Sequence, residues 1–212
     1  MKLRRTYRSI PLLAIFAVGL ATTAELQAIE IVKVEEFWEL QVGEPDDNLS
    51  APQVTMTMSP TASLDGRYFV FTLNHRTSPT YDPGGVQVQS WDGNFLGWTR
   101  SGTHNGTLHH DEEVIRWTQK LYFYGDDLVF KVSDGESESW GNFGGYPLRI
   151  QVPTSLTNLN DYRPGLSIEE SGVGYAGNRV RSLILTKLVW TTSTGEVYEL
   201  MAPIDVDTDL DP

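Results

Sequence analysis

Apolar and polar residues alternate with a period of two along most of the chain, and this pattern constrains the fold more than any other feature of the sequence. Val54, Met56 and Met58, for example, alternate with Thr55 and Thr57. Successive side chains of a strand point to opposite faces, so such a segment buries one face and exposes the other. We find no stretch of about ten or more residues with apolar side chains at the helical spacing of i, i+3, i+4 and i+7. The sequence therefore predicts an all-β protein.

About ten segments carry this alternation, and turn-forming residues separate them. They are residues 32–42, 54–58, 67–74, 85–91, 95–100, 113–124, 127–133, 147–152, 179–190 and 195–200. The clearest hairpin joins two of them across Gly125, Asp126 and Asp127. Ten or more short strands with such turns predict one antiparallel β-sandwich of the jelly-roll type, at residues 29–202. We expect residues 153–178 to be a long irregular connection.

The two ends of the chain differ from this pattern. Four basic residues between Lys2 and Arg8 precede an apolar run from Ile10 to Leu20 that is too short to span a bilayer. Residues 1–28 are therefore predicted to be a cleaved signal peptide, and the protein is expected to be secreted or periplasmic. The chain has no Cys, which favours a bacterial source for an exported domain of this size. Residues 203–212 are acidic and predict a flexible tail.

The charge of the chain narrows the classes of partner. The formal net charge is -12 at pH 7, and an acidic surface repels phosphate backbones and anionic lipids. We therefore expect no binding to nucleic acid and no membrane insertion after signal cleavage. A glycan or an extracellular protein remains as a partner. No cofactor is predicted, and calcium is open but unsupported, because the aspartates of the tail lack the glycine and the final acid of a calcium loop.

The segments LSIEESGVGYAGNRVRSLILTKLVWTT, LVFKV and PLRIQV together resemble the concanavalin A-like jelly rolls, which include lectins, laminin G-like modules and some glucanases. The resemblance implies two curved sheets, of which one has a concave face that often holds sugar in these families. The glucanases of this group carry a strand motif of Glu, an apolar residue, Asp, two further residues and Glu. That motif is missing here, so the resemblance supports binding more than hydrolysis.

The best candidate for a binding site lies in the segment GVQVQSW. Alternation places Gln87, Gln89 and Trp91 on the face opposite Val86 and Val88. Amides donate hydrogen bonds to hydroxyls and accept them, and an indole ring packs against the C–H face of a pyranose. These three residues are predicted to bind a glycan. The alternative is a polar, solvated strand face on which a neighbouring loop packs against the one large ring.

Trp140 is the fourth candidate ligand-binding residue. In the segment SWGNFGG the glycines give the backbone turns that other residues avoid, so Trp140 and Phe143 can be set at defined angles over a sheet edge. We expect Trp140 either to form the rim of the binding groove or to act as a lid of the core.

Two further clusters have weaker functional readings. The segment THNGTLHHDEE brings together three histidines and three acids, but their spacing fits no metal signature, and a polar hairpin loop is the alternative. Glu136 and Glu138 share one side of an extended segment, whereas the two carboxyls of a glycosidase approach the sugar from different sides. A charged turn at Asp134 and Gly135 is the alternative there. No catalytic residue and no metal ligand is assigned.

The leading hypothesis is therefore a secreted, non-catalytic β-sandwich that binds carbohydrate or another extracellular partner. A glycoside hydrolase or lyase of concanavalin A-like fold is the first alternative, and a structural or adhesive module without a small ligand is the second. The hydrolase predicts two carboxylates that face each other across a cleft, and the structural module predicts a surface without a pocket.

Overall fold

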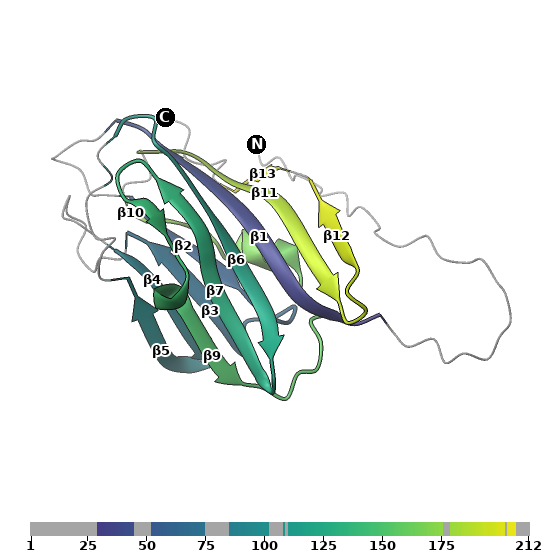
Figure 1. Ribbon diagram of the computed structural model, residues 1–212. Helices are drawn as coiled ribbons and strands as arrows, with labels where there is room; N and C mark the ends of the chain where they lie inside the picture. The colour runs from purple at the N-terminus through teal and green to yellow at the C-terminus, as the bar shows by residue number, and fades with distance from the viewer. Residues whose placement is uncertain are drawn as a thin grey trace, which may run out of the picture.

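The computed structural model describes residues 29–44, 52–74, 85–101, 108, 110–175, 179–201 and 203–206. Two antiparallel β-sheets pack face to face as two layers (Figure 1). The described residues form thirteen strands, a 3₁₀ turn η1 (Tyr146–Leu148) and one short helix α1 (Pro164–Glu169). The predicted all-β sandwich is confirmed. No helix within the described ranges has the length and hydropathy needed to cross a membrane.

The large sheet has eight strands, with the main order β12-β11-β1-β6-β7-β8. In addition, β9 pairs with β7 and β13 pairs with β11. The bounds are β1 Ile31–Val42, β6 Val114–Tyr124, β7 Asp127–Ser137, β8 Gly141–Phe143, β9 Arg149–Pro153, β11 Val180–Thr192, β12 Val197–Leu200 and β13 Ile204–Asp205. The hairpin between β6 and β7 is confirmed, since Tyr124 pairs with Asp127 across Gly125, which has a φ of 60°.

The small sheet has five strands in the order β10-β2-β3-β4-β5. Their bounds are β10 Gly172–Tyr175, β2 Gln53–Met58, β3 Arg67–Leu73, β4 Val86–Asp92 and β5 Asn94–Arg100. Strands β2 to β5 follow one another as a meander in which each strand pairs with the next in sequence. β10 arrives from the other end of the chain and pairs with β2.

The core lies between the two sheets and consists of the apolar rows that the alternation predicts. Phe69 of β3 stacks on Phe130 of β7, with ring centroids 5.2 Å apart. Phe71 of β3 meets Trp117 of β6 at 5.7 Å. These pairs bridge the two layers, and each fully buried side chain of this kind stabilises the fold by roughly 1.5–3 kcal/mol.

The connection from 153 to 178, expected to be irregular, contains α1 and β10. The N–H of Leu159 donates to the carbonyl of Ile31 over 2.7 Å, and the side chains of Leu159 and Ser167 are buried. α1 packs against β2. The segment is therefore an integrated part of the sandwich.

The turn expected at Asp134 and Gly135 is wrong, because β7 continues through both residues. Ser133 pairs with Thr118 and Glu136 with Arg116, so two residues of β7 oppose the single residue between them on β6. This is a β-bulge, and Asp134 takes the left-handed conformation with a φ of 55°. Asp tolerates that conformation better than most residues do. The chain reverses later, after Ser137.

The predictions for the two ends of the chain fall partly outside the described residues. The expected signal peptide, residues 1–28, lies outside them. Of the expected flexible tail, Ile204 and Asp205 form β13 and pair with Leu185 and Ile184 of β11. Residues 207–212 also lie outside the described ranges.

Candidate functional site: the outer face of the small sheet

Strand β4 divides its side chains between the core and the outer face of the small sheet. Val86 and Val88 are fully buried in the core. Gln87, Gln89 and Trp91 lie on the opposite face, as the alternation predicts. The structure thus brings these three sequence-predicted residues together.

Cross-strand pairing arranges the outer face in three rows. One row is aromatic and consists of Tyr68, Trp91 and Phe95. The next row consists of Thr57, Val70, Gln89 and Trp98, and the third of Thr55, Thr72, Gln87 and Arg100. Hydroxyl, amide and aromatic groups therefore alternate over a single surface.

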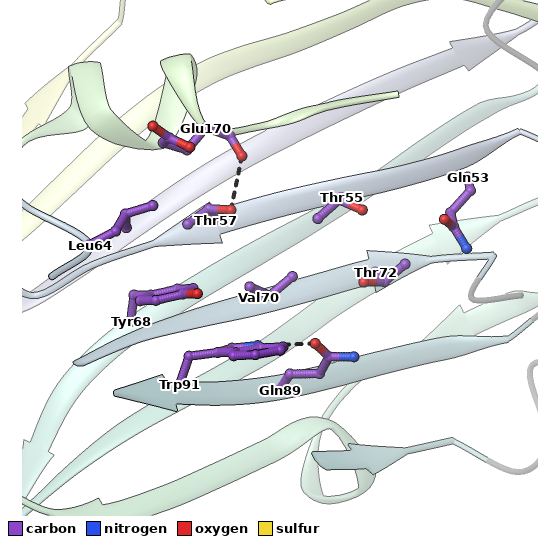
Figure 2. Close-up of a pocket in the computed structure, with 10 residues that line it drawn as sticks. All are labelled: Gln53, Thr55, Thr57, Leu64, Tyr68, Val70, Thr72, Gln89, Trp91 and Glu170. Atoms are coloured by element: carbon purple, nitrogen blue, oxygen red, sulfur yellow. Dashed lines mark hydrogen bonds between the residues drawn. The ribbon is translucent and has the colours of Figure 1, made fainter. Parts of the chain in front are cut away.

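A hollow of about 410 Å³ opens on this face above β2, β3 and β4 (Figure 2). It is lined by Gln53, Thr55, Thr57, Leu64, Tyr68, Val70, Thr72, Gln89, Trp91 and Glu170. Val70 and Thr72 form its floor on the central strand and are largely buried.

The glutamines of β4 form a hydrogen-bonded ladder with Trp91. The Nε2 of Gln89 donates to the Oε1 of Gln87 over 2.6 Å, and the indole Nε1 of Trp91 donates to the Oε1 of Gln89 over 3.1 Å. Gln87 itself is buried and does not line the hollow. The ladder therefore holds Gln89 and Trp91 in fixed orientations, and the indole N–H is used within the protein.

The aromatic row determines which ring faces the hollow. The rings of Tyr68 and Trp91 are parallel within 5°, with centroids 6.2 Å apart, and Phe95 meets Trp91 edge-on at 5.2 Å. Trp91 thus has an aromatic neighbour on each side, on β3 and on β5. Figure 2 shows Tyr68 between Trp91 and the side of the hollow formed by Thr57 and Leu64. Tyr68 presents one face of its ring to the hollow, and Trp91, which also lines the hollow, stacks on the other face.

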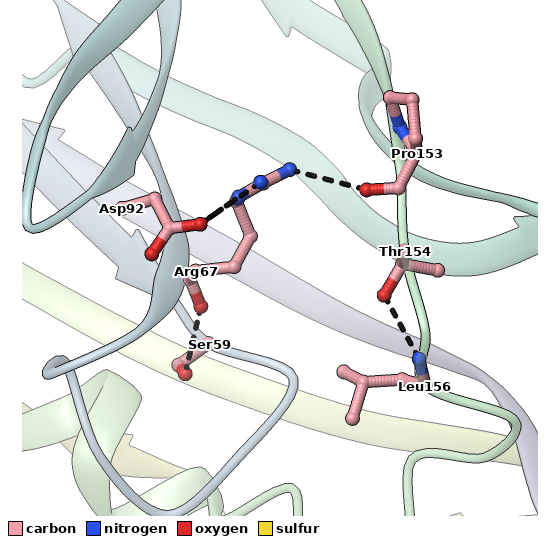
Figure 3. Close-up of polar contacts among 6 residues, drawn as sticks. All are labelled: Ser59, Arg67, Asp92, Pro153, Thr154 and Leu156. Carbon is pink, nitrogen blue, oxygen red and sulfur yellow. Dashed lines mark hydrogen bonds and ion pairs between the residues drawn. The ribbon is translucent and has the colours of Figure 1, made fainter.

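An ion pair between β3 and β4 lies next to this aromatic row. Arg67 Nη2 lies 2.9 Å from Asp92 Oδ2, and Arg67 Nη1 donates to the carbonyl of Pro153 over 3.5 Å (Figure 3). Arg67 and Asp92 are the register pair next to Tyr68 and Trp91. The contact with Pro153 also links the small sheet to β9 of the large sheet.

The opposite wall of the hollow comes from the segment after α1. The Thr57 hydroxyl donates to the carbonyl of Glu170 over 2.9 Å, and the Thr57 N–H donates to the Ser171 hydroxyl over 3.1 Å (Figure 2). Glu170 is the one charged side chain among the residues that line the hollow, within the described part of the chain. A hydrogen bond to a sugar hydroxyl is the chemistry that this carboxylate offers.

Trp140 lies elsewhere, in the turn between β7 and β8 of the large sheet. Its ring meets Phe143 at 84° and a centroid distance of 6.0 Å, and it packs against the core. It does not line the hollow. Of the two readings that the sequence left open, this placement favours the lid of the core. A role in ligand binding stays a prediction.

A buried glutamate fixes the turn that carries Trp140. Glu113 Oε1 accepts hydrogen bonds from the Ser137 hydroxyl and the Ser139 N–H, at 2.5 and 2.8 Å, and Oε2 accepts one from the Ser139 hydroxyl at 2.6 Å. The last acid of the THNGTLHHDEE cluster is therefore used within the protein. His104 and His109 lie outside the described residues, and within them no three His, Asp or Glu side chains gather as metal ligands would.

The acids expected to form a charged turn are separated. Glu136 lies on β7, where Arg116 bridges it at 3.2 Å to Glu39 of β1 at 2.7 Å. Glu138 lies in the following turn, 3.6 Å from His110 Nδ1. This outer face of the large sheet is a network of ion pairs, whereas Arg100 is the one charged side chain in the three described rows of the small sheet.

Sequence reasoning missed a second buried glutamate, Glu36, which interrupts the apolar inner row of β1. Its carboxyl has no exposed surface and accepts hydrogen bonds from Tyr162 Oη at 2.6 Å and Trp38 Nε1 at 3.0 Å. Burial raises the pKa of Glu36, and the hydroxyls of Ser167 and Tyr162 and the indole of Trp38 offset part of the effect. Gln119 is opposite Glu36 in the register, and neither polar atom of its buried amide has a hydrogen-bond partner in the described structure.

Glu36 is a structural anchor of the hollow rather than a part of it. Tyr162 and Glu170 belong to the same connection, so the hydrogen bond between Tyr162 and Glu36 attaches this connection to β1. Burial, together with the negative charge of Glu36, also raises the pKa of the Tyr162 hydroxyl well above its usual value. The sequence does contain a signal for Glu36. It lies two residues after Val34 and two before Trp38, so the alternation places this charged residue on the buried face of the strand.

Comparison with known proteins adds no family: neither the protein-family models nor the curated proteins contain a match to this chain.

Proposed function

We propose that this protein is an exported, non-catalytic module that binds a neutral carbohydrate in the hollow on the outer face of the small sheet. In this proposal the Tyr68 ring packs against the C–H face of a sugar, and Gln89, Gln53 and the three threonines exchange hydrogen bonds with its hydroxyls. The observation that carries the proposal is the hollow itself, where an aromatic wall and the hydroxyl and amide groups of Thr55, Thr57, Thr72, Gln53 and Gln89 line one space.

The chemistry of the lining supports a neutral ligand. Amides and hydroxyls both donate and accept hydrogen bonds, as the hydroxyls of a sugar do. The volume of about 410 Å³ falls within the range of roughly 300–1,000 Å³ that is typical of small-molecule sites. No basic side chain stands among the described residues of the lining, and the chain has a net charge of -12, so an anionic ligand is disfavoured.

The arrangement of acids supports binding more than hydrolysis. Glycosidases commonly use two carboxyls, roughly 5–5.5 Å apart in retaining enzymes and roughly 6.5–9.5 Å apart in inverting ones. Within the described residues the lining contributes one, Glu170. Relationship to the concanavalin A-like group and export through a signal peptide are parts of the proposal that rest on the sequence.

A glycan array probed with the full mature chain and with Tyr68→Ala tests the proposal. Wild type is expected to bind a set of neutral glycans, and Tyr68→Ala to lose that signal, because the stacking wall is gone. Tyr124→Ala is the matched control, since Tyr124 is an exposed tyrosine on β6 of the large sheet. Unfolding curves of the three proteins should be similar. Unchanged glycan binding by a folded Tyr68→Ala protein would contradict the proposed site.

A further inference from the structure

The surface that forms the hollow continues past it to the edge of the small sheet. Gln89, which lines the hollow, pairs on its other side with Trp98 of β5. Trp98 extends the row of Thr57, Val70 and Gln89 by one strand and lies on the same face. Its side chain is 51% exposed, although it is the largest on this edge strand.

Trp98 is held by a charged neighbour. The guanidinium carbon of Arg100 lies 5.2 Å from the centre of the Trp98 ring. Such a cation–π contact contributes about 0.5–1 kcal/mol at exposed sites and restrains both side chains. Arg100 is itself next to Gln87 in the third row. The edge therefore offers a restrained indole beside guanidinium N–H donors, the kinds of group that pack against a sugar ring and donate to its hydroxyls.

We infer that the ligand is an extended oligosaccharide that crosses the strands from the hollow to Trp98 and Arg100. This inference rests on the proposed function and adds the length and direction of the ligand. Neighbouring strands lie about 4.8 Å apart, so the path from β2 to β5 spans roughly 14 Å. A chain of several sugar rings covers that span, whereas one ring seated against Tyr68 does not. Trp98 is then a second platform that only longer ligands reach.

The chemistry of the row supports a glycan over a protein surface as the occupant. A protein interface core is commonly apolar and depleted of charge. Here hydroxyl, methyl, amide and indole groups follow one another across the strands, and Arg100 lies beside the indole on the same edge strand. The polar groups spread along the row match a ligand with hydroxyls along its whole length.

Calorimetric titration with oligosaccharides of increasing length tests the inference. The probes are linear glucose, xylose, mannose and N-acetylglucosamine oligomers, from the monosaccharide to the hexaose. We expect wild-type affinity to rise with length in at least one series. Trp98→Ala should lower the affinity for the longest oligomer by roughly tenfold, the loss of about one stacking contact, and leave the shortest binding oligomer unchanged. Trp98→Phe should retain most of the length dependence.

Tyr124→Ala is the matched control, because Tyr124 is also an exposed ring with a guanidinium over it, that of Arg149 at 5.9 Å. It should bind every oligomer as wild type does. Equal affinity of wild type for short and long oligomers overturns the inference and leaves the hollow proposal standing. The same conclusion follows if Trp98→Ala lowers the affinity for short and long oligomers by the same factor. A shift from dimer to monomer on that substitution assigns Trp98 to self-association instead. Absence of binding to every series counts against both proposals.

Discussion

Glu36 has an environment that a charged residue rarely occupies. A carboxyl without exposed surface lies in a row of apolar residues, and no basic side chain is among the causes that act on its pKa. Burial disfavours the charged form, so the folded protein holds a proton on Glu36 at pH values where the unfolded chain has lost it. The folded pKa is raised above the ordinary value of 4.5.

Glu36→Gln tests this reading through the pH dependence of stability. Because the folded state binds the extra proton, the free energy of unfolding of wild type should fall as pH rises from about 4.5 through the raised pKa of Glu36. The slope contributed by one group is at most about 1.4 kcal/mol per pH unit. Glu36→Gln should remove this contribution. Urea unfolding at a series of pH values measures it, and identical pH profiles of the two proteins would show that Glu36 does not titrate in that window.

Position 135 requires glycine because of a close contact, and not because of its backbone angles. A Cβ added at this position would overlap the ring of Phe143, which packs on the bulge of β7. Gly135→Ala should therefore lower the free energy of unfolding by roughly 1–3 kcal/mol, as overpacking does in cores. Gly66→Ala is the control, since no atom lies within 4 Å of the added Cβ there. Equal stability of the two variants in chemical denaturation would contradict the contact.

At the scale of elements, the sequence predicts long strands well and short insertions poorly. Apolar and polar residues alternate along β1, β3 and β6 because one face of each strand is buried. This alternation can be recognised from each strand alone. α1 and β10 are too short for any period to emerge, and β10 is defined by its pairing with β2, far away in the sequence. The bulge at Asp134 was missed because an Asp–Gly pair suits a turn equally well.

The candidate site was predictable to a similar extent. Alternation alone puts Gln87, Gln89 and Trp91 on one face. Tyr68 was missed because its place beside Trp91 depends on the register between β3 and β4, which no local pattern reveals. Glu170 lies in the connection that has no regular pattern. Trp140, chosen for its glycine-rich context, proved to lie on the other sheet.

The connection from 153 to 178 contacts Glu36 through the hydroxyl of Tyr162. Tyr162→Phe keeps the ring and removes the hydrogen bond of 2.6 Å to the Glu36 carboxyl. We expect it to lower the free energy of unfolding by about 1–3 kcal/mol, the cost of leaving a buried acceptor unpaired. Amide hydrogen exchange in α1 should also become faster, because the helix follows Tyr162 closely. Wild-type exchange rates in Tyr162→Phe would show that the hydroxyl does not anchor the helix.

On the scale of the whole molecule, the two outer faces of the sandwich have different chemistry. The large sheet presents ion pairs in which Arg116 and Lys120 each bridge two acids. The small sheet presents aromatic, amide and hydroxyl rows around the hollow. Surface ion pairs of this kind contribute little to stability and keep a sheet face soluble. The ligand-binding surface that we propose lies on the small sheet, away from these ion pairs.

Heteronuclear NMR of the protein, titrated with the strongest glycan from the array, tests the location of the site most directly. We expect shifts of the Gln87 and Gln89 side-chain amides, of the Trp91 and Trp98 indole N–H groups, and of the Tyr68 backbone amide. Signals of Arg116 and Glu136 on the large sheet should stay in place. Shifts confined to the large sheet, with the small-sheet signals unchanged, would contradict the assignment of the outer face of the small sheet as the binding surface.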